Sequence, residues 1–188
     1  MSHKQQPLLL ALLGSPQKNG TNAKLLKAFL KPITNYQIKY LTINELNLAP
    51  CTGCNQCKVT KKCNQSDDMS KLLNLFQRAD IFVLAAPVYF YTLPAQTKIV
   101  VDRSHILWQP KLPSLTKPGI FFSTCAVNKT AEFKLIVKEV KAFFNTIGFK
   151  YTEEILLPGM NSENSSSIIQ HASLLAKKLG EKINQVLV

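Results

Sequence analysis

Four of the five cysteines in this 188-residue chain fall within the thirteen residues CTGCNQCKVTKKC. Cys51, Cys54, Cys57 and Cys63 have the spacing C-x2-C-x2-C-x5-C. Thiolates two residues apart can wrap a compact cluster, and a fourth from further along the chain completes the ligation that a 4Fe–4S cluster requires. Tetrahedral zinc more often uses two separated cysteine pairs. The segment therefore predicts a 4Fe–4S cluster or four unligated thiols, with zinc as a third alternative.

A second segment with binding chemistry is GSPQKNGTN, residues 14–22, which follows the apolar run PLLLALL. Backbone N–H groups at a helix start, together with the hydroxyls of Ser15 and Thr21, form a natural cradle for a phosphate. The spacing is neither the G-x-G-x-x-G of dinucleotide domains nor that of a P-loop. The segment predicts a phosphate site, and an ordinary strand-to-helix turn is the alternative.

Both segments interrupt an alternation of strands and helices. Apolar and β-favouring runs predict strands at residues 7–13, 36–43, 81–86, 119–122 and 149–157. Apolar residues at helical spacing predict helices at 21–33, from 69 onward, at 95–106, 131–147 and 166–186. Asp67 and Asp68 are expected to cap the second of these helices. The alternation predicts one α/β domain, residues 1–188, with helices on both faces of a parallel sheet.

In such a sheet, a ligand binds beyond the carboxyl ends of the strands, where the strand order reverses. The rule points to the loops at 14–22, 87–92 and 123–129, with the cysteine segment on the same edge. Cys125 lies at an apolar strand end and is expected to be a buried thiol that faces the ligand or the core. The three histidines, His3, His105 and His171, are expected to be surface or packing residues.

Five stretches, in order along the chain, resemble the NAD(P)H-dependent FMN reductases of the flavodoxin-like superfamily. They are GSPQKNGTNAKLL, CTGCNQCK, the DDM at 67–69, PVYFYTLPAQTK at 87–98 and the DR at 102–103. The cysteine motif is similar to that of the iron–sulfur flavoproteins, a branch of the same family. The motifs extend from about Leu8 to Gly119. The resemblance implies a flavodoxin-like three-layer fold with strand order 2-1-3-4-5 and FMN where that order reverses.

The resemblance also implies roles for individual residues. The phosphate would be held by Ser15, Gln17, Asn19, Thr21 and Asn22. The isoalloxazine ring would lie along Pro87, Val88, Tyr89 and Phe90, with Thr124, Cys125 and Ala126 closing its other side. Two departures stand out: the family usually has arginine at Gln17, so Lys18 is expected to replace that charge, and its common Asn-Thr order is reversed at Thr21 and Asn22.

The function implied by the resemblance is an FMN-dependent oxidoreductase that takes electrons from NAD(P)H. The acceptors would be small molecules such as a quinone or a nitro- or azo-aromatic, and ferredoxin becomes a partner if a cluster is present. Relatives usually form homodimers or homotetramers, for which the loop Trp108–Pro118 is a candidate contact. A non-enzymatic electron carrier of the flavodoxin type is the alternative, although flavodoxins are typically acidic and lack these cysteines.

The formal net charge of +12 comes from scattered lysines. Without an arginine-rich stripe or interleaved aromatics, the charge indicates solvated faces that attract anionic cofactors, and no nucleic acid is expected. No apolar run approaches the roughly 20 residues of a membrane-spanning helix, so no membrane association is expected. The start of the chain lacks the features of a signal peptide, and we expect a cytoplasmic protein, where clustered thiols favour a metal or redox role.

Overall fold

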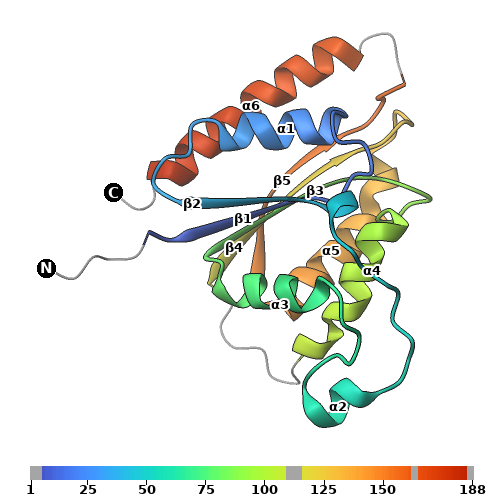
Figure 1. The fold of residues 1–188 in the computed structure, drawn as a ribbon. Coiled ribbons are helices and arrows are strands. Elements are labelled where there is room, and N and C mark those ends of the chain that lie inside the picture. Colours follow the sequence, from blue (N-terminus) through green and yellow to red (C-terminus); the bar gives the residue numbers. More distant parts are fainter. Residues whose placement is uncertain (1–5, 109–115, 162–164, 186–188) are drawn as a thin grey trace, which may run out of the picture.

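The computed structural model describes residues 6–108, 116–161 and 165–185. Its centre is a parallel five-stranded sheet with the order β2-β1-β3-β4-β5 (Figure 1). The strands are β1 (Leu8–Leu13), β2 (Gln37–Thr42), β3 (Ile81–Pro87), β4 (Lys117–Thr124) and β5 (Phe149–Leu157). The predicted strand order is confirmed, and the reversal lies between β1 and β3.

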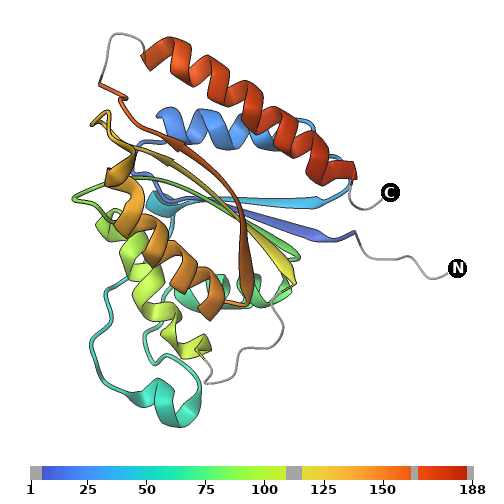
Figure 2. The same cartoon turned by 180° about the vertical axis from the view of Figure 1, so that it is seen from behind.

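Helices cover both faces of the sheet (Figures 1 and 2). One face carries α1 (Thr21–Leu30) and α6 (Ser165–Gln185), and the other carries α3 (Met69–Arg78), α4 (Ala95–Arg103) and α5 (Lys134–Thr146). Short 3₁₀ turns occupy Ile43–Glu45, Ser104–Leu107 and Thr130–Phe133. None of the helices in the described ranges is long and apolar enough to cross a membrane.

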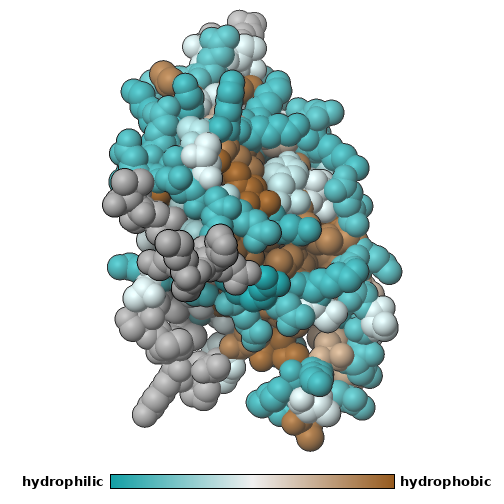
Figure 3. Space-filling view, turned by 60° about the vertical axis from the view of Figure 1, so that its left-hand side comes forward, coloured by the Kyte–Doolittle hydropathy of each residue, from teal (hydrophilic) through white to brown (hydrophobic). Residues whose placement is uncertain are grey.

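The two faces bury separate cores because side chains alternate along each strand. In β1, Leu10 and Leu12 pack with α3 and α5, whereas Leu9 and Leu13 pack with α1 and α6. All six residues of β1 are buried, as expected of a central parallel strand. Figure 3 views the side of the molecule at which the strands begin. Hydrophilic residues cover most of this side, and hydrophobic residues are visible in its middle.

The structure corrects several predicted element bounds. The helix predicted at 95–106 ends at Arg103 and continues as a 3₁₀ turn, Ser104–Leu107, which contains His105. The cysteine segment contains a short helix, α2 (Gln56–Thr60), that the pattern did not indicate and that buries none of its residues. Residues 109–115 of the predicted contact loop Trp108–Pro118 lie outside the described ranges.

Candidate functional site

The loop after β1 is fixed to the sheet and to α4. Gly14 N–H donates to the carbonyl of Ala85 at 2.8 Å, which extends the pairing of β1 with β3 by one residue. The Gly14 carbonyl accepts a hydrogen bond from the buried Thr97 hydroxyl at 2.7 Å. A Cβ at Gly14 would lie 2.7 Å from Thr97 Oγ1, so the close approach requires glycine. These contacts therefore fix the backbone at the point where the loop leaves the sheet and runs toward the start of α1.

The start of α1 presents backbone N–H groups and two polar side chains. Gly20 is the N-cap, and no side chain caps it, so the first-turn N–H groups remain available to an anion. Ser15 is buried, and its hydroxyl accepts a hydrogen bond from Gln17 N–H at 3.2 Å. Asn22 is also buried and donates to Thr124 Oγ1 at 2.8 Å, whereas its Oδ1 has no partner among the described residues. This end of the sheet is therefore built to receive a polar ligand.

A tight aromatic turn follows β3. Tyr89 and Thr92 exchange two backbone hydrogen bonds of 3.0 and 3.1 Å, and the intervening Phe90 and Tyr91 have φ angles of 46° and 69°. Bulky residues rarely adopt positive φ, so this turn carries backbone strain. Leu93 N–H donates to the half-buried carboxylate of Glu139 at 3.2 Å and so fixes the far end of the turn. Burial raises the pKa of Glu139.

These loops enclose a cleft of about 270 Å³ at the reversal point of the sheet. Its walls come from the ends of β1, β3, β4 and β5 and from the start of α1. The lining residues are Ser15, Gln17, Gly20, Thr21, Asn22, Pro87, Val88, Tyr89, Thr124, Cys125, Ala126, Met160 and Asn161.

The cysteine segment, which includes α2, forms a second site. Positive φ angles at Gly53, Asn55 and Lys61 curl the backbone around a cavity of about 140 Å³. Cys51, Cys54, Cys57 and Cys63 all line this cavity, together with Gln65, Arg103, His105 and Ile106. In the parts of the chain that the structure describes, no three His, Cys, Asp or Glu side chains converge on a single point as ligands of one metal ion. The four cysteines are thus neighbours around one cavity.

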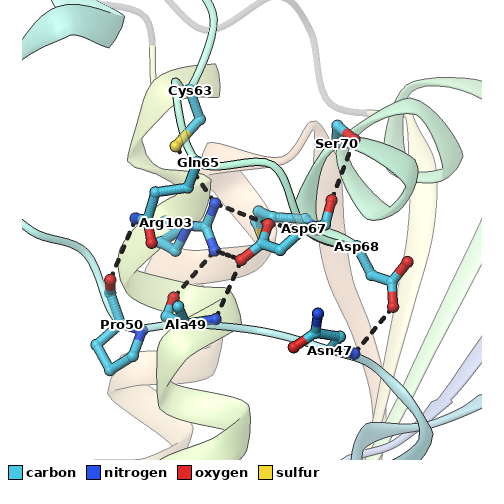
Figure 4. Close-up of polar contacts among 10 residues, drawn as sticks. Asn47, Ala49, Pro50, Cys63, Gln65, Asp67, Asp68, Ser70 and Arg103 are labelled. Atoms are coloured by element: carbon cyan, nitrogen blue, oxygen red, sulfur yellow. Dashed lines mark hydrogen bonds and ion pairs between the residues drawn. The ribbon is translucent and has the colours of Figure 1, made fainter.

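Arg103 binds the base of this cysteine loop (Figure 4). The residue is only 4% exposed, and its guanidinium makes a bidentate ion pair with Asp67. It also donates to the carbonyl of Ala49 at 2.9 Å and to Cys63 Sγ at 3.3 Å. Partial burial disfavours the Asp67 carboxylate, but hydrogen bonds from Arg103, Ala49 and Met69 outweigh it and lower the Asp67 pKa. The segments before and after the cysteines are therefore joined through one buried charge pair.

Two of the thiols, Cys63 and Cys57, contact the basic side chains of Arg103 and His105. Partial burial opposes ionisation of Cys63, but hydrogen bonds from Gln65 N–H and Arg103 outweigh it and lower the pKa of this thiol. Cys57 Sγ lies 3.4 Å from His105 Nε2. The other ring nitrogen, Nδ1, lies 2.8 Å from the carbonyl oxygen of Asp102 and must donate to it. In the neutral imidazole, Nε2 is then the acceptor of the Cys57 thiol proton.

The comparisons with known proteins agree with this geometry. A family model described as NADPH-dependent FMN reductase matches residues 7–146. The chain belongs to this family. An iron–sulfur flavoprotein of Archaeoglobus fulgidus is 38% identical over 96 residues, which cover 50% of this chain and 44% of that protein. A second iron–sulfur flavoprotein, from Methanocaldococcus jannaschii, is 35% identical over 101 residues, which cover 53% of this chain and 52% of that protein.

The chain spans about half the length of these curated relatives. Two solved structures share its fold over nearly their full length. An azoreductase from Bacillus anthracis superposes with a TM-score of 0.77 at 19% identity, covering 94% of this chain and 99% of that one. An NAD(P)H:quinone oxidoreductase from Methanothermobacter marburgensis gives 0.70 at 13% identity, covering 96% and 98%. The predicted resemblance to the FMN reductase family and its iron–sulfur flavoprotein branch is confirmed.

In this family member, most of the residues predicted to bind FMN line the cleft. Three do not. Lys18 pairs with Glu45 at 2.8 Å on the surface, Asn19 is exposed and absent from the lining, and Phe90 is 97% exposed at the tip of the aromatic turn. The four predicted metal-binding cysteines line their own cavity.

The sequence reasoning missed several lining residues. Met160 and Asn161 follow β5, whose carboxyl end lies at the same edge as the other loops, so the strand-end rule could have found them. His105 was expected to be a surface or packing residue, and it is exposed, but it contacts Cys57.

The predicted cap of α3 also differs, because Met69 N–H donates to Asp67 while the Asp68 carboxylate accepts from Asn47 N–H.

Proposed function

We propose that this chain is an FMN-dependent oxidoreductase that takes electrons from NAD(P)H and delivers them to a small-molecule acceptor such as a quinone or a nitro- or azo-aromatic. A 4Fe–4S cluster on the four cysteines is its second redox centre. The observation that carries the proposal is the cleft at the reversal point of the sheet, in a member of the FMN reductase family. Bound FMN supplies hydride and electron transfer that protein side chains cannot perform.

The residues of the cleft fit the parts of FMN. The uncapped N–H groups at the start of α1 suit a phosphate, because the helix dipole favours negative charge there. The buried Oδ1 of Asn22, which has no hydrogen-bond partner within the described ranges, suits a hydroxyl donor of the ribityl chain. Val88 and Tyr89 offer an apolar and an aromatic surface beside it. Glu139 holds the far end of the aromatic turn in place by accepting the hydrogen bond from Leu93 N–H.

The cysteine cavity fits a polynuclear cluster better than a zinc ion. Structural zinc sites more often use two separated cysteine pairs, whereas here four cysteines at the spacing C-x2-C-x2-C-x5-C line one cavity of about 140 Å³. A cubane cluster instead fills the space between four separated thiolates. The exposed Lys58, Lys61 and Lys62 surround the loop and offset the negative charge of thiolates.

The proposal also includes two kinds of protein partner, a ferredoxin and further copies of this chain. Ferredoxin is a further electron donor or acceptor for the cluster, and the net charge of +12 favours an acidic carrier. The chain is also proposed to form a homodimer or homotetramer, which would cover the exposed Tyr89, Phe90 and Tyr91.

Purification without oxygen tests both cofactors in one preparation. We expect flavin absorption with one FMN per chain and a broad shoulder that accompanies iron and acid-labile sulfide. Replacing Cys54 with serine should remove the shoulder and the iron while the flavin remains, and Cys125→Ser is the matched control that keeps the iron. Steady oxidation of NAD(P)H with a quinone is expected. Stoichiometric electron exchange alone would instead identify a carrier, and a colourless protein that binds no added FMN would refute the function.

A further inference from the structure

The guanidinium of Arg103 connects three segments that are distant in sequence. It comes from the last residue of α4 and contacts the Ala49 carbonyl, the Asp67 carboxylate and Cys63 Sγ. The Ala49 contact lies just before the first cysteine of the loop, and the other two lie at its end. The arginine therefore lies where the cysteine loop leaves and rejoins the fold (Figure 4).

The loop itself has few buried contacts that could hold its shape. Helix α2 buries no residue, and Cys51 and Cys54 are exposed. Its base is closed by backbone pairing of Asp68 N–H with the Asn47 carbonyl at 3.0 Å and by Gln65 Nε2 with the Pro50 carbonyl at 3.2 Å. Since an exposed loop without a core gains little from hydrophobic burial, the buried pair of Arg103 and Asp67 is the strongest contact that fixes the position of Cys63.

Arg103 is a permanent hydrogen-bond donor to the sulfur of Cys63. An arginine does not lose its proton in proteins, and its planar fork can serve the carboxylate and the sulfur at once. Burial keeps water from competing for the Nη2 proton. The sequence has two arginines and 21 lysines, and one of the two is placed against a sulfur. A lysine ammonium at this position would lack the fork that makes the three contacts together.

We propose that Arg103 is a positioning residue for the cluster, that it fixes Cys63, and that its N–H···S hydrogen bond raises the reduction potential of the cluster. The inference rests on the proposed function, since it requires that the four cysteines hold a 4Fe–4S cluster. Reduction adds one electron and thus one negative charge to the cluster. A positive donor beside one ligand sulfur stabilises the reduced form more than the oxidised form, and hydrogen bonds to sulfur are among the determinants of these potentials.

The test compares the midpoint potential of the cluster in the wild type, Arg103→Gln and Arg103→Lys, measured by redox titration of the anaerobic protein. Arg78→Gln is the matched control, because Arg78 is an exposed arginine at the end of α3. FMN content and FMN potential report whether each variant is folded. We expect a more negative cluster potential in Arg103→Gln, a smaller shift in the same direction in Arg103→Lys, and no shift in the control.

The outcomes separate this inference from the proposed function. A wild-type protein that binds FMN but holds no iron and sulfide would overturn the cluster, and with it the role of Arg103. A wild-type protein with a cluster whose potential is unchanged in Arg103→Gln would overturn the role of Arg103 alone. If Arg103→Gln does not bind FMN and is therefore unfolded, Arg103→Lys decides: a lowered potential supports the inference, and a wild-type potential refutes it.

Discussion

The contact between Gly14 and Thr97 predicts how a single methyl group affects the cleft at the reversal point of the sheet. In Gly14→Ala, the new Cβ would lie 2.7 Å from Thr97 Oγ1, 3.1 Å from Thr97 Cγ2 and 3.2 Å from Ala86 Cβ. Thr97 is fully buried and cannot turn toward solvent. Overpacking of this kind costs about 1–3 kcal/mol of folding free energy. Because the loop leads directly into the start of α1, we also expect weaker FMN binding.

A second substitution separates the clash from other effects of the alanine. Thr97→Ala removes the hydroxyl that donates to the Gly14 carbonyl, which costs about 1–3 kcal/mol when the carbonyl is left unpaired. It also removes both of the closest atoms facing a Cβ at residue 14. The double variant should therefore be hardly less stable than Thr97→Ala alone, with a favourable coupling of about 1–3 kcal/mol.

The assay is urea unfolding of the FMN-free protein, combined with FMN titration followed by quenching of flavin fluorescence. The two single variants and the double variant complete the cycle with the wild type. Additive destabilisation, with no coupling between residues 14 and 97, would refute the steric reasoning. Unchanged FMN affinity in Gly14→Ala would refute the link between this loop and the proposed phosphate site.

Three further predictions concern other contacts. Gly180→Ala should lower the free energy of unfolding by about 1–3 kcal/mol despite the better helix propensity of alanine, because its Cβ would overlap the Phe29 carbonyl; a more stable variant in urea would contradict this. Asn22→Leu should weaken FMN binding by roughly 10- to 100-fold in fluorescence titration, while the same change at the exposed Asn19 should have little effect. The lowered pKa of Asp67 means that its stabilising contribution is complete above about pH 4 and is lost as the pH falls through the lower folded value. Acid unfolding should accordingly be less steep in Asp67→Asn than in the wild type.

The fold could be predicted from the sequence because its central strands are continuous apolar runs. Runs such as Leu8–Leu13 and Ile81–Ala86 are apolar at every position, which is typical of strands covered on both faces. Their alternation with amphipathic helices then leaves few topologies, and the strand-end rule located the cleft. These signals are local and periodic, so one sequence is enough to show them.

The parts that could not be predicted depend on contacts between distant residues. Nothing near Arg103 in the sequence indicates that its side chain reaches Asp67 and Cys63. His105, in the 3₁₀ turn that directly follows α4, contacts Cys57, which is 48 residues away in the chain. The positive φ angles at Phe90 and Tyr91 had no sequence signal either, since such turns usually carry glycine or asparagine. Long-range pairing and local strain of this kind are visible only in three dimensions.

Helix α4 has a consequence for anyone who wishes to redesign this protein. Thr97 of this helix anchors the Gly14 loop at the cleft, and Arg103 anchors Cys63 at the cysteine cavity. The two residues are six positions apart on one helix, which is about 9 Å along its axis. A rigid strut transmits a displacement at either end to the opposite end. Mutagenesis intended to alter one pocket without disturbing its neighbour should therefore target the flanking loops and leave the strut intact.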